Sequence, residues 1–208
     1  MSKKHFVVDL DDVVFDLWGT LLPELNKAQG TYVKKEEMTN YHGCLSLFGL
    51  TLHEFLHFIV DKKILNRIPL KSLVHPSLTQ LKQQGQIHLI TARGFDPDAE
   101  SLTRQALSYY DLPYDTLTIT SVERKIDACP VDPCDVSATF DDYDGHVWPW
   151  VHELPDNHPH QSYLIKQPWN DHLDIQGHQR IHKVSHLYDG VQHWCRHFVN
   201  NQFKQKIG

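Results

Sequence analysis

Short apolar runs typical of buried strands alternate with segments of helical periodicity along most of the chain. The runs that we expect to form strands are residues 5–10 (HFVVDL), 86–91 (QIHLIT), 115–120 (DTLTIT), 136–142 (VSATFDD) and 161–166 (QSYLIK). Strands that alternate with helices favour an α/β fold, in which a parallel sheet carries helices on both faces. The pattern therefore predicts a sheet of five parallel strands.

The helical segments carry their own start and stop signals. Residues 75–85 (HPSLTQLKQQG) predict a helix that ends at Gly85. Residues 96–110 predict another, with Asp96 as N-cap and Pro97 in its first turn. The C-terminal region also has apolar residues at helical spacing, which predicts a helix packed on the core. These residues are Val184, Leu187, Tyr188, Val191, Trp194, Cys195 and Phe198.

Residues 18–69 differ from the rest of the chain. They contain no clear strand pattern, and the stretch CLSLFGLTLHEFLHFIV is rich in Leu and Phe. We interpret them as a small helical cap subdomain inserted after the first strand, with residues 1–17 and 70–208 forming the α/β core. Phe48, Phe55 and Phe58 are expected to form the interior of this cap.

Composition limits the classes of function. The 208-residue chain has a net charge of -6, which argues against a protein that grips long nucleic acid. No run of about 18 apolar residues occurs, so we expect no membrane span. The N-terminus lacks the long apolar region of a signal peptide, and four scattered cysteines are too few for a disulfide scaffold. We therefore expect a cytoplasmic protein, whose oligomeric state remains open.

Polar residues, most of them carboxylates, occur at the ends of the predicted strands or just after them. Because ligands of parallel sheets bind beyond the carboxyl ends of the strands, these side chains should meet in one crevice. Carboxylates crowded in this way raise each other's pKa, so the cluster calls for a cation or a retained proton. The residues are Asp9, Asp11, Thr91, Lys125, Asp141 and Asp142.

These residue types suit phosphoryl transfer. A carboxylate such as Asp9 can attack phosphorus to form an aspartyl-phosphate, and Asp11 can protonate the leaving group and then activate water. Mg²⁺ prefers oxygen ligands, which Asp9 and Asp141 supply. Thr91 and Lys125 offer a hydrogen-bond donor and a positive charge for the phosphoryl oxygens. The cluster therefore predicts a magnesium-assisted phosphoryl-transfer site.

Four motifs in order strengthen this prediction. DLDDVV, LITARG, ERK and ATFDD resemble the motifs of the haloacid dehalogenase-like (HAD) superfamily, over essentially the whole chain. The resemblance implies a Rossmann-like core, an Mg²⁺-dependent phosphatase, Asp9 as nucleophile and Asp11 as general acid/base. An acid at the position of Asp11 favours phosphatases over the dehalogenase branch.

The resemblance also implies roles for the later motifs. Thr91 and Lys125 would bind phosphate, while Asp141 would bind Mg²⁺ with Asp142 as a supporting acid. The metal would also contact Asp9 and the backbone carbonyl of Asp11. Arg93, in TARG, either reaches the phosphate or caps a helix.

Within the superfamily the chain is most similar to the 5'(3')-deoxyribonucleotidases, because a helical insertion follows the first motif and YLIKQPWN resembles their late strand and turn. This implies a deoxynucleoside monophosphate as substrate, with Trp18 and Tyr41 as candidate substrate contacts. Three features depart from the pattern: Asp12 occupies a position often held by glycine, Leu17 replaces an expected aromatic residue, and YDGHVWPW replaces an expected Ser-Pro turn.

Two further classes of function stay open. One is a HAD phosphatase for another small phosphomonoester, such as a sugar phosphate, or for a nucleic-acid 3'-phosphate end, although the acidic composition disfavours a polymer. The other is a nucleotide-binding protein without turnover, against which the complete set of catalytic positions weighs. Base and sugar preference, and 5' against 3' phosphate, are not determined by the sequence.

Overall fold

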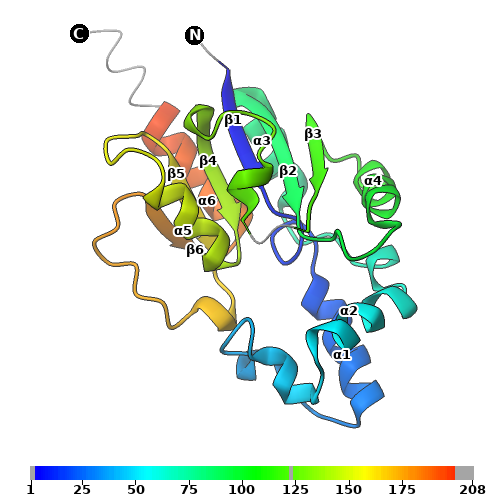
Figure 1. The fold of residues 1–208 in the computed structure, drawn as a ribbon. Coiled ribbons are helices and arrows are strands. Elements are labelled where there is room, and N and C mark those ends of the chain that lie inside the picture. Colours follow the sequence, from blue (N-terminus) through cyan, green and yellow to red (C-terminus); the bar gives the residue numbers. More distant parts are fainter. Residues whose placement is uncertain (1–2, 122–123, 200–208) are drawn as a thin grey trace, which may run out of the picture.

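A parallel sheet forms the centre of the molecule (Figure 1). The computed structural model describes residues 3–121 and 124–199, and within them the sheet has six strands in the order β3-β2-β1-β4-β5-β6. Every neighbouring pair runs parallel. The α/β architecture predicted from the sequence is confirmed. The strands are β1 (Lys4–Val8), β2 (Gly85–Thr91), β3 (Thr116–Ile119), β4 (Val136–Asp141), β5 (Gln161–Ile165) and β6 (Ile181–Val184).

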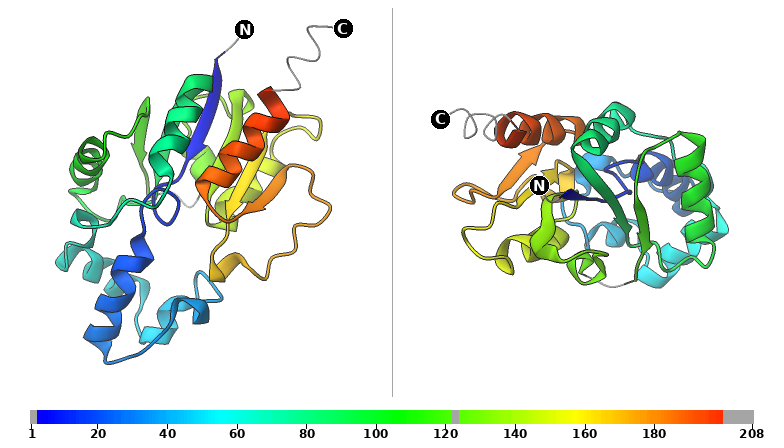
Figure 2. Two further views of the ribbon diagram at one scale, coloured as in Figure 1. Left: turned by 180° about the vertical axis from the view of Figure 1, so that it is seen from behind. Right: turned by 90° about the horizontal axis from the view of Figure 1, so that it is seen from above.

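Helices cover both faces of the sheet. α3 (Val74–Gln84) and α6 (Leu187–Trp194) lie side by side on one face, α5 (Asp144–His152) lies on the other, and α4 (Ala99–Tyr109) lies beside the edge strand β3 (Figure 2). Within the described ranges no helix is both long enough and apolar enough to cross a membrane.

The two faces of the sheet are packed by alternate residues of each strand. Phe6 and Val8 of β1 belong to the core under α3 and α6, whereas Val7 packs on the opposite face with Trp150 of α5. The ring of Phe6 meets Trp194 of α6 edge to face, with centroids 4.8 Å apart. Period-two alternation is thus what makes both faces of the sheet apolar.

The C-terminal region differs from the prediction of a single helix. Val184 belongs to β6, which pairs with β5, and the backbone N–H of Lys166 donates to its carbonyl over 2.8 Å. The helix begins only at Leu187, three residues later, and a π-helical turn (Cys195–Val199) follows it. Helical spacing across this junction is accidental, because an edge strand satisfies the same apolar positions. The side chain of Phe198 lies outside the described part.

The start of α4 also differs from the prediction. The helix begins at Ala99 rather than after Asp96. The Asp96 side chain accepts from the N–H of Asp98 over 2.8 Å and its carbonyl accepts from Ala99 over 3.1 Å, so it closes the turn before the helix. The predicted stop of α3 at Gly85 is confirmed.

The segment expected to form a cap lies beyond the carboxyl end of the sheet (Figure 1). It contains α1 (Leu17–Gln29) and α2 (Leu52–Asp61) with short 3-10 turns between them. The two connections to the core run side by side, since the N–H of Asp16 donates to Pro69 and that of Lys71 to Val14. The division into core and cap stays a prediction. Between the two helices lie η1 (Lys35–Glu37) and η2 (Cys44–Phe48), and η3 (Ile64–Asn66) follows α2. Elsewhere in the described chain, 3-10 turns occur at η4 (Lys125–Ala128), η5 (Pro133–Asp135) and η6 (Pro168–Asn170).

Candidate active site

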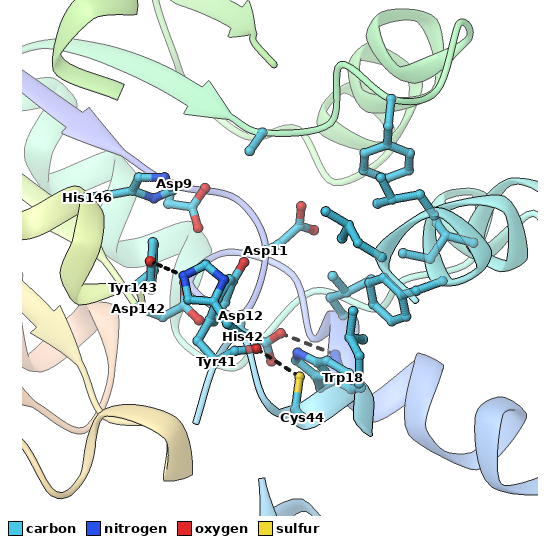
Figure 3. A pocket seen from close by; sticks show the side chains of 18 of the residues that line it. Asp9, Asp11, Asp12, Trp18, Tyr41, His42, Cys44, Asp142, Tyr143 and His146 are labelled. Atoms are coloured by element: carbon cyan, nitrogen blue, oxygen red, sulfur yellow. Dashed lines mark hydrogen bonds between the residues drawn. The ribbon is translucent and has the colours of Figure 1, made fainter. Parts of the chain in front are cut away.

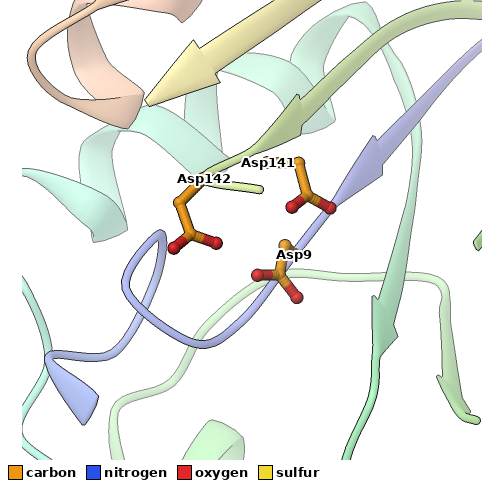
Figure 4. Close-up of side chains that lie close together, drawn as sticks. All are labelled: Asp9, Asp141 and Asp142. Atoms are coloured by element: carbon orange, nitrogen blue, oxygen red, sulfur yellow. The ribbon is translucent and has the colours of Figure 1, made fainter. Parts of the chain in front are cut away.

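The strand order reverses between β1 and β4, and a parallel sheet opens a crevice at such a point. Asp9 directly follows β1 and Asp141 ends β4, with the N–H of Asp9 donating to the carbonyl of Phe140 over 2.9 Å. The carboxylates of Asp9, Asp141 and Asp142 point toward one another, each offering an oxygen within 4.8 Å of the others (Figure 4). Topology thus brings together acids that are more than a hundred residues apart.

Lys125 neutralises part of this charge. Its buried Nζ lies 2.6 Å from Asp9 Oδ1 and 2.8 Å from Asp141 Oδ2. Burial by itself would lower the pKa of Lys125, but the two carboxylates raise it above the usual value. The same pairing, with His146, overcomes burial and lowers the pKa of Asp141. Lys125 and Asp141 are therefore charged at neutral pH. Glu123, in the same motif, lies outside the described residues.

Asp9 and Asp142 show the opposite behaviour. Burial raises the pKa of Asp9 to about 7, with the charges of Asp141 and Asp11 adding to the rise and Lys125 opposing it. Burial and the charge of Asp9 raise the pKa of Asp142 well above its ordinary value. Among the described residues the Asp142 carboxylate has no hydrogen-bond or ion-pair partner. Carboxylates that are costly to ionise and face one space, with only oxygen donors, fit a hard divalent cation such as Mg²⁺.

The two acids at the end of β4 are both buried but differ in how many partners their carboxylates have. Both oxygens of Asp141 are engaged, because Oδ2 accepts from Lys125 and Oδ1 faces the N–H of Tyr143 at 3.0 Å and His146 Nδ1 at 3.4 Å. Asp142 instead holds its backbone carbonyl in hydrogen bonds from the turn after β5, which leaves its carboxylate at the cavity. The sequence predicted Asp141 as the ligand and Asp142 as its support. In the structure it is the Asp142 carboxylate that has no protein partner among the described residues, whereas both oxygens of Asp141 are engaged.

Asp11 is held by an arginine. Arg93 is fully buried and donates to both oxygens of Asp11, from Nε over 2.9 Å and from NH2 over 2.6 Å. Its remaining nitrogen donates to Thr103 Oγ1, and Thr91 Oγ1 lies 3.4 Å from Asp11 Oδ2. Neither Thr91 nor Arg93 is among the residues that line the cavity. Their phosphate-binding roles stay predictions, and the Asp11–Arg93 pair is a contact that the sequence did not indicate.

Asp12 adopts the left-handed conformation that favours glycine, with φ of 57°. Its carboxylate accepts from the N–H of Trp18 over 3.3 Å and from Lys35 Nζ over 3.2 Å. Its carbonyl accepts from Lys71 Nζ over 2.6 Å and from Gln167 Nε2 over 3.1 Å. The aspartate at this position therefore has a structural role. Hydrogen bonds of Asp12 join the loop after β1 to α1, to η1, to the connection that leads back from the cap segment, and to the turn after β5.

A cavity of about 430 Å³ extends from the acids to side chains of α1 and α2, which line its other end (Figure 3). Trp18 and Tyr41, the candidate substrate contacts, both line it, as do Asp9, Asp11 and Lys125. Of the phenylalanines expected to fill the interior of the cap, Phe48 is buried, whereas Phe55 stacks on Trp18 and also lines the cavity.

Three residues of the site were missed from the sequence. His42 Nε2 lies 2.6 Å from the hydroxyl of Tyr143, Tyr41 stacks on that ring at 4.2 Å, and His146 contacts Asp141. Tyr143 directly follows the fourth motif (ATFDD), and His146 comes four residues after its end, at the start of α5. This closeness to the motif is the signal that could have indicated them. Nothing in the sequence near His42 does so.

Known proteins were compared with the chain at the level of sequence and of structure. No protein-family model matches it, and no curated protein matches it either. Solved structures do. A haloacid dehalogenase-like family hydrolase from Xanthomonas campestris has a TM-score of 0.58 at 13% identity, covering 92% of this chain and 94% of that one. A haloacid dehalogenase-like hydrolase from Streptococcus pneumoniae has a TM-score of 0.59 at 11% identity, covering 92% and 98%.

A third structure agrees with these two. A HAD-superfamily hydrolase from Geobacter sulfurreducens has a TM-score of 0.54 at 14% identity, over 91% of this chain and 95% of that one. At such low identities the likeness concerns the fold. The chain thus has the HAD-like α/β fold expected from its motifs.

Proposed function

We propose that the protein is an Mg²⁺-dependent phosphatase of the HAD superfamily that hydrolyses small phosphomonoesters through an aspartyl-phosphate at Asp9. One observation carries the proposal: three buried carboxylates and Lys125 converge at the reversal of strand order in a HAD-like fold. Asp9 and Asp142, with oxygens facing the cluster, would hold the metal beside Asp141 and the backbone of Asp11. Bound Mg²⁺ would neutralise charge on the phosphoryl oxygens.

The residues divide the chemistry as follows. An oxygen of Asp9 forms a bond to phosphorus while the ester P–O bond breaks, and Asp11 gives its proton to the departing alkoxide. Water then attacks the aspartyl-phosphate, passes a proton to Asp11, and releases phosphate with Asp9 restored. Lys125 stays charged and faces Asp9, where negative charge accumulates. Arg93 holds Asp11 in place between the two steps.

The narrower proposal is a deoxynucleoside monophosphate as substrate. The aromatic side chains of Trp18 and Tyr41 at the cavity support it. The motif YLIKQPWN supports the site rather than the substrate, because Trp169 Nε1 and Asn170 Nδ2 both donate to the carbonyl of Asp142, over 3.2 and 2.8 Å.

Replacement of Asp9 tests the covalent mechanism. Asp9→Asn keeps the shape of the side chain and leaves Lys125 paired with Asp141, so the fold should persist while phosphate release falls at least about 10³-fold. Asp98→Asn, at an exposed acid before α4, is the matched control and should keep wild-type turnover. EDTA should abolish the wild-type activity, and added Mg²⁺ should restore it. Substantial turnover by Asp9→Asn would rule out the aspartyl-phosphate.

A further inference from the structure

The cavity has two ends of different chemistry. At one end lie the acids, Lys125 and the ring cluster of His42 and Tyr143, whereas the helix α2 forms much of the opposite wall (Figure 3). α2 presents a single apolar stripe to the cavity, at positions spaced three and four residues apart as on one face of a helix. The stripe consists of Leu52, Phe55, Leu56 and Ile59.

This wall offers nothing to a polar ligand. The polar residues of α2 that neighbour the stripe, His53, Glu54 and His57, are exposed and do not line the cavity. Leu17, Leu45 and Leu65 continue the apolar surface, and the neighbouring Cys44 thiol already donates to the carbonyl of Tyr41 over 3.0 Å. A hydroxyl placed against this surface would lose its water without gaining a partner, which costs free energy.

Charge restricts the ligand to one phosphate. Lys125 is the one Lys or Arg side chain among the described residues that line the cavity, and it is already shared by two carboxylates. A second phosphate nearer the cap would face Asp11 and Asp12, whose cationic neighbours Arg93 and Lys35 are already paired with them. Di- and bisphosphates are therefore disfavoured.

We infer that the α2 stripe receives the organic part of the substrate and selects monophosphate esters of apolar, aryl-bearing alcohols over those of polyhydroxylated sugars. This inference rests on the proposed phosphatase activity and narrows its substrate. A deoxynucleoside meets the requirement in part, since it presents a flat base and lacks one hydroxyl of the ribose.

Two esters of primary alcohols, which leave with similar ease, test the ranking. We expect kcat/KM for 2-phenylethyl phosphate to exceed that for ribose 5-phosphate at least about tenfold, since the buried ring gains transfer free energy and the sugar hydroxyls lose hydrogen bonds. Equal values, or a preference for ribose 5-phosphate, would overturn the inference even though the phosphatase proposal stood. If neither ester is hydrolysed and no phosphate is released from deoxynucleoside monophosphates either, the phosphatase proposal fails. Calorimetric binding of 2-phenylethyl phosphate against ribose 5-phosphate then decides the inference by the same ranking.

Two variants on α2 distinguish an effect of the apolar stripe on substrate selectivity from a general disturbance of the structure. Leu56→Gln places an amide of similar size in the stripe, and it should lower the ratio of the two kcat/KM values at least about fivefold. Val60→Gln makes the same chemical change one turn further along the helix, at a half-buried residue that does not line the cavity, and should leave the ratio unchanged. A merely structural disturbance would lower both kcat/KM values together, so an unchanged ratio in Leu56→Gln would contradict the inference.

Discussion

The ionised Asp142 carboxylate lowers the stability of the metal-free protein, yet it is the form that can bind a metal ion. Its folded-state pKa lies well above 3.8, so the folded protein holds the proton more tightly than the unfolded chain. Stability therefore falls as the pH rises from the unfolded pKa to the folded one. Ionised Asp142 therefore destabilises the metal-free fold, and a bound cation would offset this loss of stability.

Asp142→Asn should therefore stabilise the metal-free protein. In EDTA at pH 8 we expect a higher unfolding free energy, on the order of 1 kcal/mol, and this gain should disappear below about pH 4. Saturating Mg²⁺ should raise the melting temperature of the wild type and of the Asp98→Asn control, but not that of Asp142→Asn. Thermal unfolding measures both effects. An equal Mg²⁺-induced shift in Asp142→Asn would remove Asp142 from the metal site.

His160 gives a second prediction at the scale of the residue, away from the site. The ring is fully buried, stacks on Trp150, and contacts the Val136 carbonyl at 3.0 Å and Ser162 Oγ at 2.9 Å. Burial lowers its pKa to about 3. Because the unfolded chain binds this proton near pH 6.5, the folded state should lose stability as the pH falls below that value.

A His160→Gln variant, whose side chain stays neutral, isolates the contribution of His160 to the pH dependence of the unfolding free energy. Relative to His160→Gln, the wild type should lose about 1.4 kcal/mol of unfolding free energy for each pH unit between about 6 and 4. Urea denaturation at several pH values measures the difference in slope, to which an overall loss of packing in the variant does not contribute. His57→Gln, at an exposed ring, should leave the slope unchanged. Parallel slopes for wild type and His160→Gln would show that the buried ring is protonated in the folded state.

At the scale of the element, the loop after β1 depends on a backbone conformation as well as on contacts. Asp12 has positive φ, which costs a residue with a Cβ about 1 kcal/mol relative to glycine. Asp12→Gly and Asp12→Ala lose the same bonds to Trp18 and Lys35, but glycine tolerates the conformation. We expect Asp12→Ala to be less stable than Asp12→Gly by about 1 kcal/mol in chemical denaturation.

The two variants control for each other. Both remove a buried carboxylate whose pKa burial raises to about 6, so this electrostatic effect cancels in their difference. Equal stabilities would mean that the loop changes conformation in the variants. A more stable alanine variant would contradict the observed φ as the reason why this position favours glycine.

At the scale of the whole molecule, contacts across the cavity join residues 18–69, the predicted cap, to the rest of the fold. His42 and Tyr41 come from the segment between β1 and β2, whereas Tyr143 follows β4, and the rings and the 2.6 Å hydrogen bond join the two sides of the mouth (Figure 3). The strength of this contact should set how often residues 18–69 move away from the core.

Tyr143→Phe removes the hydrogen bond to His42 and leaves a ring to stack on Tyr41. A lost hydrogen bond of about 1 kcal/mol should raise the open population, and with it the rate of proteolytic cleavage within residues 17–69, by about fivefold. Tyr109→Phe, at a ring that is 82% exposed, is the control. Unchanged cleavage in Tyr143→Phe would mean that the contact does not hold the cap.

Local sequence patterns were enough to predict five of the six parallel strands and the acids at their carboxyl ends. Strand and helix periodicities are local, and the carboxyl ends of parallel strands must meet at one edge, so Asp9 and Asp141 could be placed together from their positions alone. The same reasoning predicted a helical segment between β1 and β2. It failed for Val184, because an edge strand and a helix can place the same apolar residues.

Which atoms face each other in the site depends on how the whole chain folds. Three features depend on side-chain directions and on packing between segments far apart in the chain. They are the pairing of Asp11 with Arg93, the Asp142 carboxylate without a protein partner among the described residues, and the apolar wall formed by α2. No local pattern encodes these, because the free energy of a buried charge or an apolar wall depends on what the rest of the fold places opposite it.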